Sequence, residues 1–304
     1  MITKFGKRFL TNYLAGNIDF SQREIAFGIG STAADANGND TRLGFEFYRA
    51  VVRIGSIDIV NTGSEQSPVY TYKVVYQATI PQDVAGVISE MALYPSSRRS
   101  TNNFDSNMIT TFENNLSWTD SNQENPQLQL NTTQLVSKIG ENMVYVQVPA
   151  STVKEYGTPL GNLDLSGYSV NDSIAIAYKK ADNNVSKIRL KFYSSATQYC
   201  FVDFTPEAMG GTPDKIQSTT LNNLFSNTSA TPPDFTNIIK LGVEVTANSS
   251  GTTTVYFDGI RINDEDTFDA NYGMISRSVL TGGNIITKTS GRQVDIEYKL
   301  QLGF

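Results

Sequence analysis

The chain has 304 residues, with 24 Lys and Arg against 30 Asp and Glu, so its formal net charge is −6 at pH 7. The sequence contains no histidine, which excludes Ser-His-Asp and Cys-His triads, imidazole zinc sites and a histidine base. The single cysteine, Cys200, excludes an internal disulfide, and its aromatic neighbours indicate an apolar core residue. The acidic balance and the lack of a long Lys/Arg block argue against nucleic acid as a partner.

The N-terminal segment, residues 2–15, predicts a short helix. Its apolar residues recur on one helical face, and Gly16-Asn17 end it. A helix that packs on the core is favoured over one on a membrane surface, because the segment has few cations. No apolar run approaches the roughly 18 residues of a membrane helix, and Thr11-Asn12 interrupt any signal peptide. We therefore expect synthesis in a cytoplasm and no membrane partner.

The rest of the chain predicts strands, separated by turn clusters rich in Asn, Ser and Gly. Many strands with no helical segment between them favour an antiparallel sandwich over a parallel sheet, so the predicted fold class is all-β. The last strand has a continuous apolar face that needs a partner sheet. The expected strands are 25–29, 43–48, 51–60, 69–80, 145–148, 173–178, 187–193, 200–204, 238–245, 252–262 and 293–302.

Two short motifs were weighed for ligand binding. Gly28-Ile29-Gly30 follows a strand, but no helix pattern follows it, so a glycine turn is favoured over a dinucleotide loop. The acidic group Asp264-Glu265-Asp266, with Asp258 and Asp269, could supply oxygens to a hard cation. Its spacing is not that of an EF-hand, and a solvated acidic turn is the favoured interpretation.

One set of segments resembles the N-terminal domains of bacteriophage tail-fibre, collar and related virion structural proteins. It consists of an opening helix, an A-x-G-x-G turn, a D-T-x-L-x-x-E element, a long strand and an I-S-E-M-A-L-Y step. The closing stretch from Ser276 is similar to the last strands of such a domain. The matching positions are Ala26, Gly28 and Gly30; Asp40, Thr41, Leu43 and Glu46; and Ile88, Glu90, Leu93 and Tyr94.

Residues 109–266 resemble jelly-roll carbohydrate-binding modules. The stretch FENNLSW, from Phe112, is similar to their opening F-E-x-x-x-x-W, and three strand segments follow in the family's order. The resemblance implies one cofactor at most, a structural Ca²⁺ between Glu113 and Asp258. It also implies an aromatic sugar platform, for which Trp118, Tyr193 and Tyr199 are the candidates. Burial of two of these three in the core is the favoured interpretation.

Together the resemblances imply a virion-attachment β-domain, residues 1–108 plus 267–304, into which a jelly-roll domain, 109–266, is inserted. The chain is expected to leave the first domain in the polar stretch 96–107 and to return to it in the acidic turn 264–270. The two domains together suit a non-enzymatic structural protein of a bacteriophage virion, in the tail, neck, baseplate, fibre or capsid decoration. Its partners would be other virion proteins and copies of itself. A host-surface glycan adhesin is the alternative, and a glycan-active enzyme with two carboxylates about 5–10 Å apart is a third.

Overall fold

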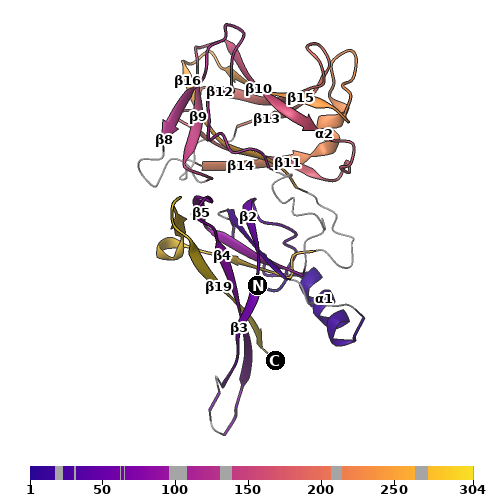
Figure 1. Cartoon of the computed structure of the whole chain (residues 1–304), viewed down its shortest axis with the longest axis vertical. Helices are drawn as coiled ribbons and strands as arrows, with labels where there is room; N and C mark the ends of the chain where they lie inside the picture. The colour runs from indigo at the N-terminus through magenta and orange to yellow at the C-terminus, as the bar shows by residue number, and fades with distance from the viewer. Residues whose placement is uncertain are drawn as a thin grey trace. The chain divides into compact units, whose positions relative to one another are not determined.

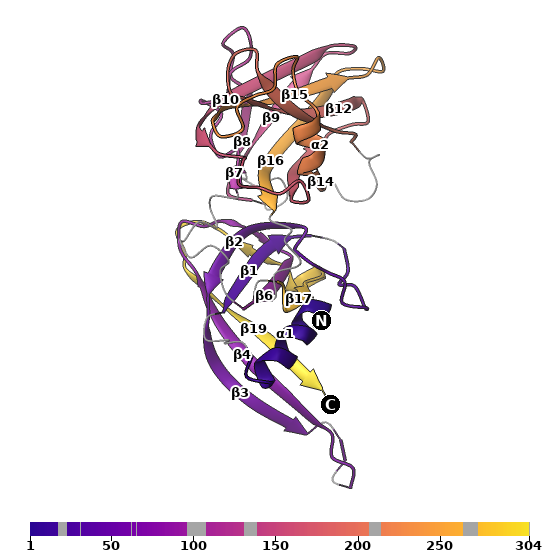
Figure 2. The same cartoon turned by 90° about the vertical axis from the view of Figure 1, so that its right-hand side faces the viewer.

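The computed structural model describes residues 1–17, 23–30, 32–61, 63–64, 66–95, 108–130, 139–206, 214–263 and 273–303. The chain forms two compact units (Figures 1 and 2). Unit 1 combines Met1–Asp105 with Asp266–Phe304, and unit 2 comprises Ser106–Glu265. The all-β fold class with a short N-terminal helix is confirmed. The predicted seam at 96–107 and the acidic turn at 264–270 lie outside the described residues.

Unit 1 begins with the helix α1 (Lys4–Leu14), which is capped by Thr3. The Thr3 hydroxyl accepts a hydrogen bond from the Gly6 amide at 2.9 Å, which satisfies one of the free donors at the helix start. A Cβ at Gly6 would lie 2.1 Å from the Ile275 carbonyl oxygen, so only glycine lets the helix pack this closely. The first part of α1 therefore packs onto the C-terminal part of the chain, and Phe9 is buried there. The predicted apolar face does not pack along its whole length, because Tyr13 and Leu14 at its end are exposed.

Unit 1 contains antiparallel sheets that interleave the two ends of the chain. One has the order β17-β6-β1-β2, another β19-β4-β3, and the strands β18 and β5 form a third. The apolar face of the predicted last strand packs on β4, with Ile296 opposite Ala78 and Tyr298 opposite Tyr76. The strands are β1 (Glu24–Ile29), β2 (Phe45–Val51), β3 (Arg53–Asn61), β4 (Tyr70–Ile80), β5 (Gly86–Ile88), β6 (Glu90–Tyr94), β17 (Ser276–Val279), β18 (Ile286–Lys288) and β19 (Val294–Gly303), and a 3-10 turn spans Gly282–Asn284.

Unit 2 is an antiparallel β-sandwich. One sheet has the order β10-β15-β12-β13; the other has the order β14-β11-β16-β9-β8, with β7 paired to β16. The side chains between the sheets form one core, to which β9, β11, β12 and β13 contribute apolar residues at every second position. The elements are β7 (Met108–Thr110), β8 (Gln127–Leu130), β9 (Asn142–Val148), β10 (Val153–Leu163), β11 (Ser173–Lys180), β12 (Val185–Tyr193), β13 (Tyr199–Phe204), β14 (Asp214–Thr220), α2 (Leu221–Ser226), β15 (Ile238–Ala247) and β16 (Thr253–Asn263).

Two details of the sequence prediction are wrong. The expected strand 51–60 is divided, because β2 ends at Val51 in one sheet and β3 starts at Arg53 in another. The expectation of strands without helices misses α2, whose Leu221 and Leu224 side chains are buried in the core. Neither described helix is long and apolar enough to span a membrane.

Candidate functional site

The sheet β10-β15-β12-β13 presents a face that points away from the sandwich core. Because strand side chains alternate, the buried Ile188, Leu190 and Phe192 of β12 leave the residues between them on the opposite side. The same alternation holds on β13 and β15. We call this surface the outer face; it comprises Glu155, Arg189, Lys191, Tyr193, Tyr199, Phe201, Asp203, Lys240, Gly242 and Glu244.

Three aromatic side chains form a row on the outer face. Tyr193 and Tyr199 lie opposite each other on β12 and β13, and their ring centroids are 5.1 Å apart. Phe201 follows, with its ring centroid 6.2 Å from that of Tyr199. Tyr193 is only 8% exposed, whereas Tyr199 and Phe201 are half-buried. The row therefore offers its outer two rings to a ligand and uses Tyr193 as their inner support.

A hydrogen-bonded ion network lies beside the aromatic row. The Lys191 ammonium is 2.7 Å from a carboxylate oxygen of Glu155 and 2.7 Å from one of Glu244. The Tyr193 hydroxyl donates to the other Glu155 oxygen at 2.7 Å. Burial alone would lower the pKa of Lys191, but the hydrogen bonds to the two carboxylates outweigh it and raise that pKa. Burial, followed by the Glu155 carboxylate, raises the pKa of Tyr193, so its hydroxyl stays a donor.

Gly242 makes room for this network. A Cβ at that position would lie 2.6 Å from the Glu155 oxygen Oε1 and 3.0 Å from the Tyr193 ring. Any larger residue in the middle of β15 would therefore push Glu155 and Tyr193 apart. A glycine inside a strand weakens it, so its presence here fits a requirement for space above the sheet.

Cations lie over each ring of the row. The Arg189 guanidinium is 4.0 Å from the Phe201 centroid and pairs with Asp203 at 2.6 and 2.8 Å. The ammonium of Lys191 is 5.4 Å from the Tyr199 centroid. The Lys240 ammonium is 4.7 Å from the Tyr193 centroid. These cation–π contacts orient the rings and surround them with hydrogen-bond donors.

The predicted platform residue Trp118 lies elsewhere. Its side chain is 2% exposed and stacks on Phe112, with the ring centroids 4.9 Å apart, inside the core of unit 2. This placement removes Trp118 from the candidate site. Tyr193 and Tyr199 are brought together, and the structure adds Phe201 to them.

The two predicted calcium ligands, Glu113 and Asp258, both bind backbone amides of one short segment. The Asp258 carboxylate accepts from the Ile139 amide at 3.2 Å, and Glu113 accepts from the Glu141 and Asn142 amides at 3.1 Å. Burial raises the pKa of Glu113 to about 7, although these hydrogen bonds oppose the shift. The two carboxylates hold the chain where it enters β9.

The donor set at this segment is smaller than calcium normally uses. Calcium takes six to eight oxygens, whereas the atoms nearest the Glu113 oxygens are N–H groups, which cannot bind a cation. In the described part of the chain no group of three or more acidic or thiol side chains is gathered as a metal site would need. The calcium site therefore stays a prediction.

The only thiol, Cys200, lies in the core of unit 2, as predicted. Burial raises the pKa of its thiol to about 12. Its side chain lies on the core side of β13, whereas Tyr199 and Phe201 on either side lie on the outer face. The thiol thus takes no part in the candidate site.

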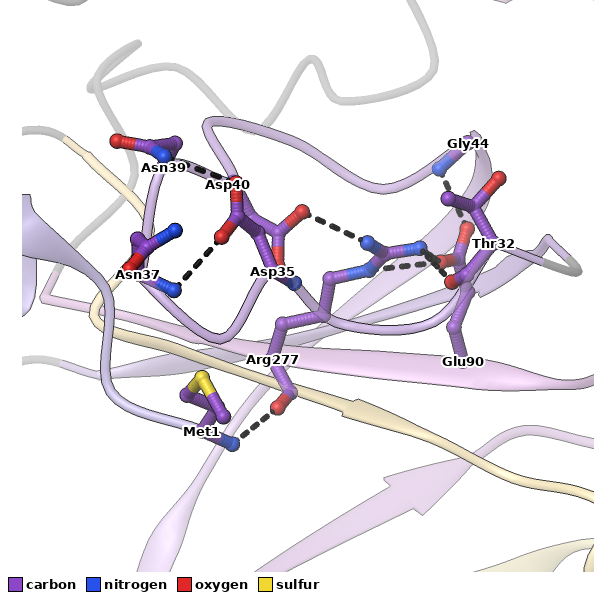
Figure 3. Close-up of polar contacts among 9 residues, drawn as sticks. All are labelled: Met1, Thr32, Asp35, Asn37, Asn39, Asp40, Gly44, Glu90 and Arg277. Atoms are coloured by element: carbon purple, nitrogen blue, oxygen red, sulfur yellow. Dashed lines mark hydrogen bonds and ion pairs between the residues drawn. The ribbon is translucent and has the colours of Figure 1, made fainter.

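Unit 1 holds a buried charge cluster built from residues far apart in sequence (Figure 3). The Arg277 guanidinium donates to Glu90 at 2.6 and 3.0 Å and to Asp40 at 2.9 Å. The Gly44 amide donates to Glu90 at 2.5 Å. A Cβ at Gly30 would lie 2.7 Å from the Glu90 carboxylate, so this glycine makes space for the ion pair. The predicted glycine turn is wrong, because Gly28 and Ile29 lie within β1.

The sequence analysis missed the residues that surround the aromatic row. Glu155 lies on β10, a strand interrupted by glycine and proline that no alternating pattern revealed. Lys191 and Phe201 lie on strands that were predicted, at the positions that alternate with core residues, so the period of two could have identified them. Glu244 could have been found in the same way on β15.

No protein-family model matches the sequence, and no curated protein matches it. Among solved structures, the chain is similar to a family 11 carbohydrate-binding module from Clostridium thermocellum in complex with a β-1,3-1,4-mixed-linked tetrasaccharide. The identity is 16%, the match covers 52% of this chain and 95% of that one, and the TM-score is 0.36. It is also similar to the family 30 carbohydrate-binding module of a cellulosomal cellulase from the same organism. Here the identity is 14%, the coverage 53% and 98%, and the TM-score 0.38.

A third similar structure is the enzymatically active domain of tailspike protein 4 of bacteriophage CBA120. The identity is 8%, the match covers 50% of this chain and 20% of that one, and the TM-score is 0.31. The likenesses in all three cases extend over about half of this chain. The described strands themselves define an all-β protein with a β-sandwich unit.

Proposed function

We propose that unit 2 is a carbohydrate-binding module that holds glycan on its outer face. The observation that carries the proposal is the row of Tyr193, Tyr199 and Phe201 beside a network of charged hydrogen-bonding groups. Sugar rings have C–H faces that pack on aromatic rings, and hydroxyls that bind charged donors and acceptors. The outer face supplies both kinds of partner within one sheet.

Different residues of the outer face would stack on the sugar rings and bind the sugar hydroxyls. Tyr199 and Phe201 would stack on the sugar rings, because they are more exposed than Tyr193. Lys240 and Glu155 would bind hydroxyls, since both lie beside the Tyr193 ring and are only 3.9 Å apart. The contacts already made by Lys191 hold Glu155 and Glu244 in place before a ligand arrives, which lowers the entropy lost on binding.

A glycan array tests this proposal. The purified full chain is screened against soluble oligosaccharides of β-linked hexopyranoses and bacterial surface polysaccharides, with Tyr199→Ala beside it. Loss of the stacked ring should weaken binding about tenfold. Tyr145→Ala is the matched control, because Tyr145 packs against Tyr256 on the other sheet, with the two rings tilted and their centroids 5.3 Å apart. No binding by the wild type, or equal loss in both variants, would refute the proposal.

We propose further that the module binds without turnover. Two carboxylates of the outer face, Glu155 and Glu244, share the Lys191 ammonium, and neither can approach a glycosidic oxygen without breaking that contact. The third, Asp203, is held in the same way by Arg189. A reducing-sugar assay on every glycan bound by the array tests this. Release of reducing ends by the wild type, lost in Glu155→Gln, would reopen the enzyme interpretation.

A second proposal concerns unit 1, which we propose serves as the attachment domain of a bacteriophage structural protein. Support comes from the charge cluster, in which Gly30, Asp40 and Glu90, three of the positions that resemble virion proteins, meet Arg277 from the closing stretch. Partners would be other virion proteins and copies of this chain, and the location would be the virion.

Particle composition tests the attachment role. Mass spectrometry of purified phage particles should detect the chain, and deletion of residues 293–304 should remove it, because β19 supplies a whole ladder of backbone bonds to β4. Charge reversal of the exposed Glu297 should leave incorporation unchanged. Particles that lack the wild-type chain would refute this role.

A further inference from the structure

The sheet β19-β4-β3 ends in an apolar strand that faces solvent. Its last strand, β3, pairs only with β4 among the described strands, and the two strands curve together away from the rest of unit 1 (Figure 2). Ile57 and Ile59 on β3 are 66% and 61% exposed. The apolar face of β4 continues beside them at Tyr70 and Tyr72, which are also exposed. Exposed apolar side chains in such a group mark an interaction surface.

The outer edge of β3 is also suited to pairing with another strand. An edge strand offers a row of backbone donors and acceptors, which natural proteins often protect with lysine or proline. The sequence of β3, RIGSIDIVN, contains neither. Its nine residues are long enough to form a stable pair with a strand of similar length.

The charges on β3 indicate which strand fits. Arg53 lies opposite Gln77 of β4 and Asp58 lies opposite Lys73, with Gly55 as the extra residue of a bulge between them. Gln77 and Lys73 are four residues apart on β4, so Arg53 and Asp58 lie on the same face of the sheet. With Gly55 left out of the pairing in each copy, as it is against β4, two copies of β3 that run antiparallel around Ser56 would bring Arg53 of each beside Asp58 of the other.

The apolar residues match in the same register. Ile54 of each copy would lie opposite Ile57 of the other, and Ser56 would lie at the twofold axis. Opposite charges and apolar pairs directly across two strands both stabilise a sheet. A register centred on Asp58 would instead place two carboxylates against each other, which disfavours that slip.

We propose that two copies of this chain pair through β3 into a continuous antiparallel sheet of order β19-β4-β3-β3-β4-β19. Such an interface is isologous, the commonest kind in homo-oligomers, since each surface supplies both halves of every contact. It buries the exposed isoleucines and joins the outer edges of β3. The inference rests on unit 1 alone and is independent of glycan binding by unit 2.

A charge-swap series tests the register, with mass measured by analytical ultracentrifugation on the full chain. The wild type should be dimeric at micromolar concentration. Arg53→Asp and Asp58→Arg each place like charges opposite one another twice, so each should raise the dissociation constant about tenfold or more. The double variant restores both pairs and should regain the dimer. A wild type that stays monomeric, or a double variant that does not recover, would overturn the proposal.

The same series distinguishes pairing of β3 with a second β3 from pairing of β3 with β19, the strand at the other edge of the sheet. If β3 paired with β19 of a neighbour, Lys299→Glu on β19 would disturb assembly and the double swap would not rescue it. Arg53 is exposed, whereas Asp58 is half-buried and pairs with Lys73 of its own chain at 3.9 Å, so folding of each variant is checked by thermal unfolding. A second test uses Ser56→Cys, which should form a disulfide-linked dimer on oxidation. Ser250→Cys, exposed on a turn of unit 2, is the control that should remain monomeric.

Discussion

Arg277 and Glu90 are 187 positions apart in the sequence, yet their side chains form a buried ion pair at 2.6 Å. Arg277 also reaches Asp40 at 2.9 Å, so one guanidinium joins the first, middle and last segments of unit 1 (Figure 3). The structure of unit 1 therefore depends on contacts that only the complete chain can make.

Loss of one partner should destabilise unit 1 strongly. Arg277→Met leaves the buried Glu90 carboxylate without its cation, and such a change costs about 3–5 kcal/mol. Chemical unfolding of the full chain should show the transition of unit 1 at lower denaturant, with that of unit 2 unmoved. The control is Lys299→Met, whose exposed pair with Glu297 at 3.8 Å should change stability by less than about 1 kcal/mol. Equal effects of the two variants would contradict the role of the buried cluster.

Removal of the C-terminal stretch should unfold unit 1 and spare unit 2. A fragment that ends at residue 268 lacks β17, β18 and β19, so the buried faces of β6, β5 and β4 lose their partners. Its NMR spectrum should retain only the dispersed resonances of the sandwich. A stable, dispersed spectrum from residues 1–108 alone would contradict this expectation.

Local patterns were sufficient to predict most of the strands and part of the site. Alternation with a period of two identified β12 and β13. Tyr193 and Tyr199 were candidates only through the resemblance to carbohydrate-binding modules, and the pairing of the two strands brings them together. The position of Trp118 could not be predicted, since an aromatic side chain suits a core and a sugar platform equally. Glu155 and Arg277 depend on the pairing of distant strands, which no local pattern contains.

Cys200 should be chemically inert in the folded protein. The thiolate is the reactive form, and burial raises the pKa of this thiol to about 12, so almost none is ionised at pH 8. Reaction with a thiol reagent should begin only when unit 2 unfolds. The midpoint of the reaction along a denaturant series should therefore coincide with the midpoint of the unfolding transition followed by circular dichroism. Rapid modification in buffer would show that the core around Cys200 is open.

Calcium, where it binds, should stabilise unit 2 alone through Glu113 and Asp258. Binding to the folded state raises stability by about 2.7 kcal/mol at a hundredfold excess over Kd. Calorimetry of the full chain with calcium and with chelator measures this difference in the stability of unit 2, and Asp258→Asn should abolish it. Identical melting curves in the two buffers would show that the two carboxylates bind the backbone amides and do not bind calcium.

Hydrogen–deuterium exchange with a bound oligosaccharide tests the central claim, glycan binding on the outer face, most directly. The probe is the tightest oligosaccharide from the array, added to the full chain at saturating concentration. Protection should concentrate on β12, β13 and β15, whose backbones lie under Tyr193, Tyr199 and Gly242, and it should be weaker in Tyr199→Ala at the same oligosaccharide concentration. Protection confined to the other sheet of unit 2 or to unit 1, with the outer face unchanged, would contradict the account.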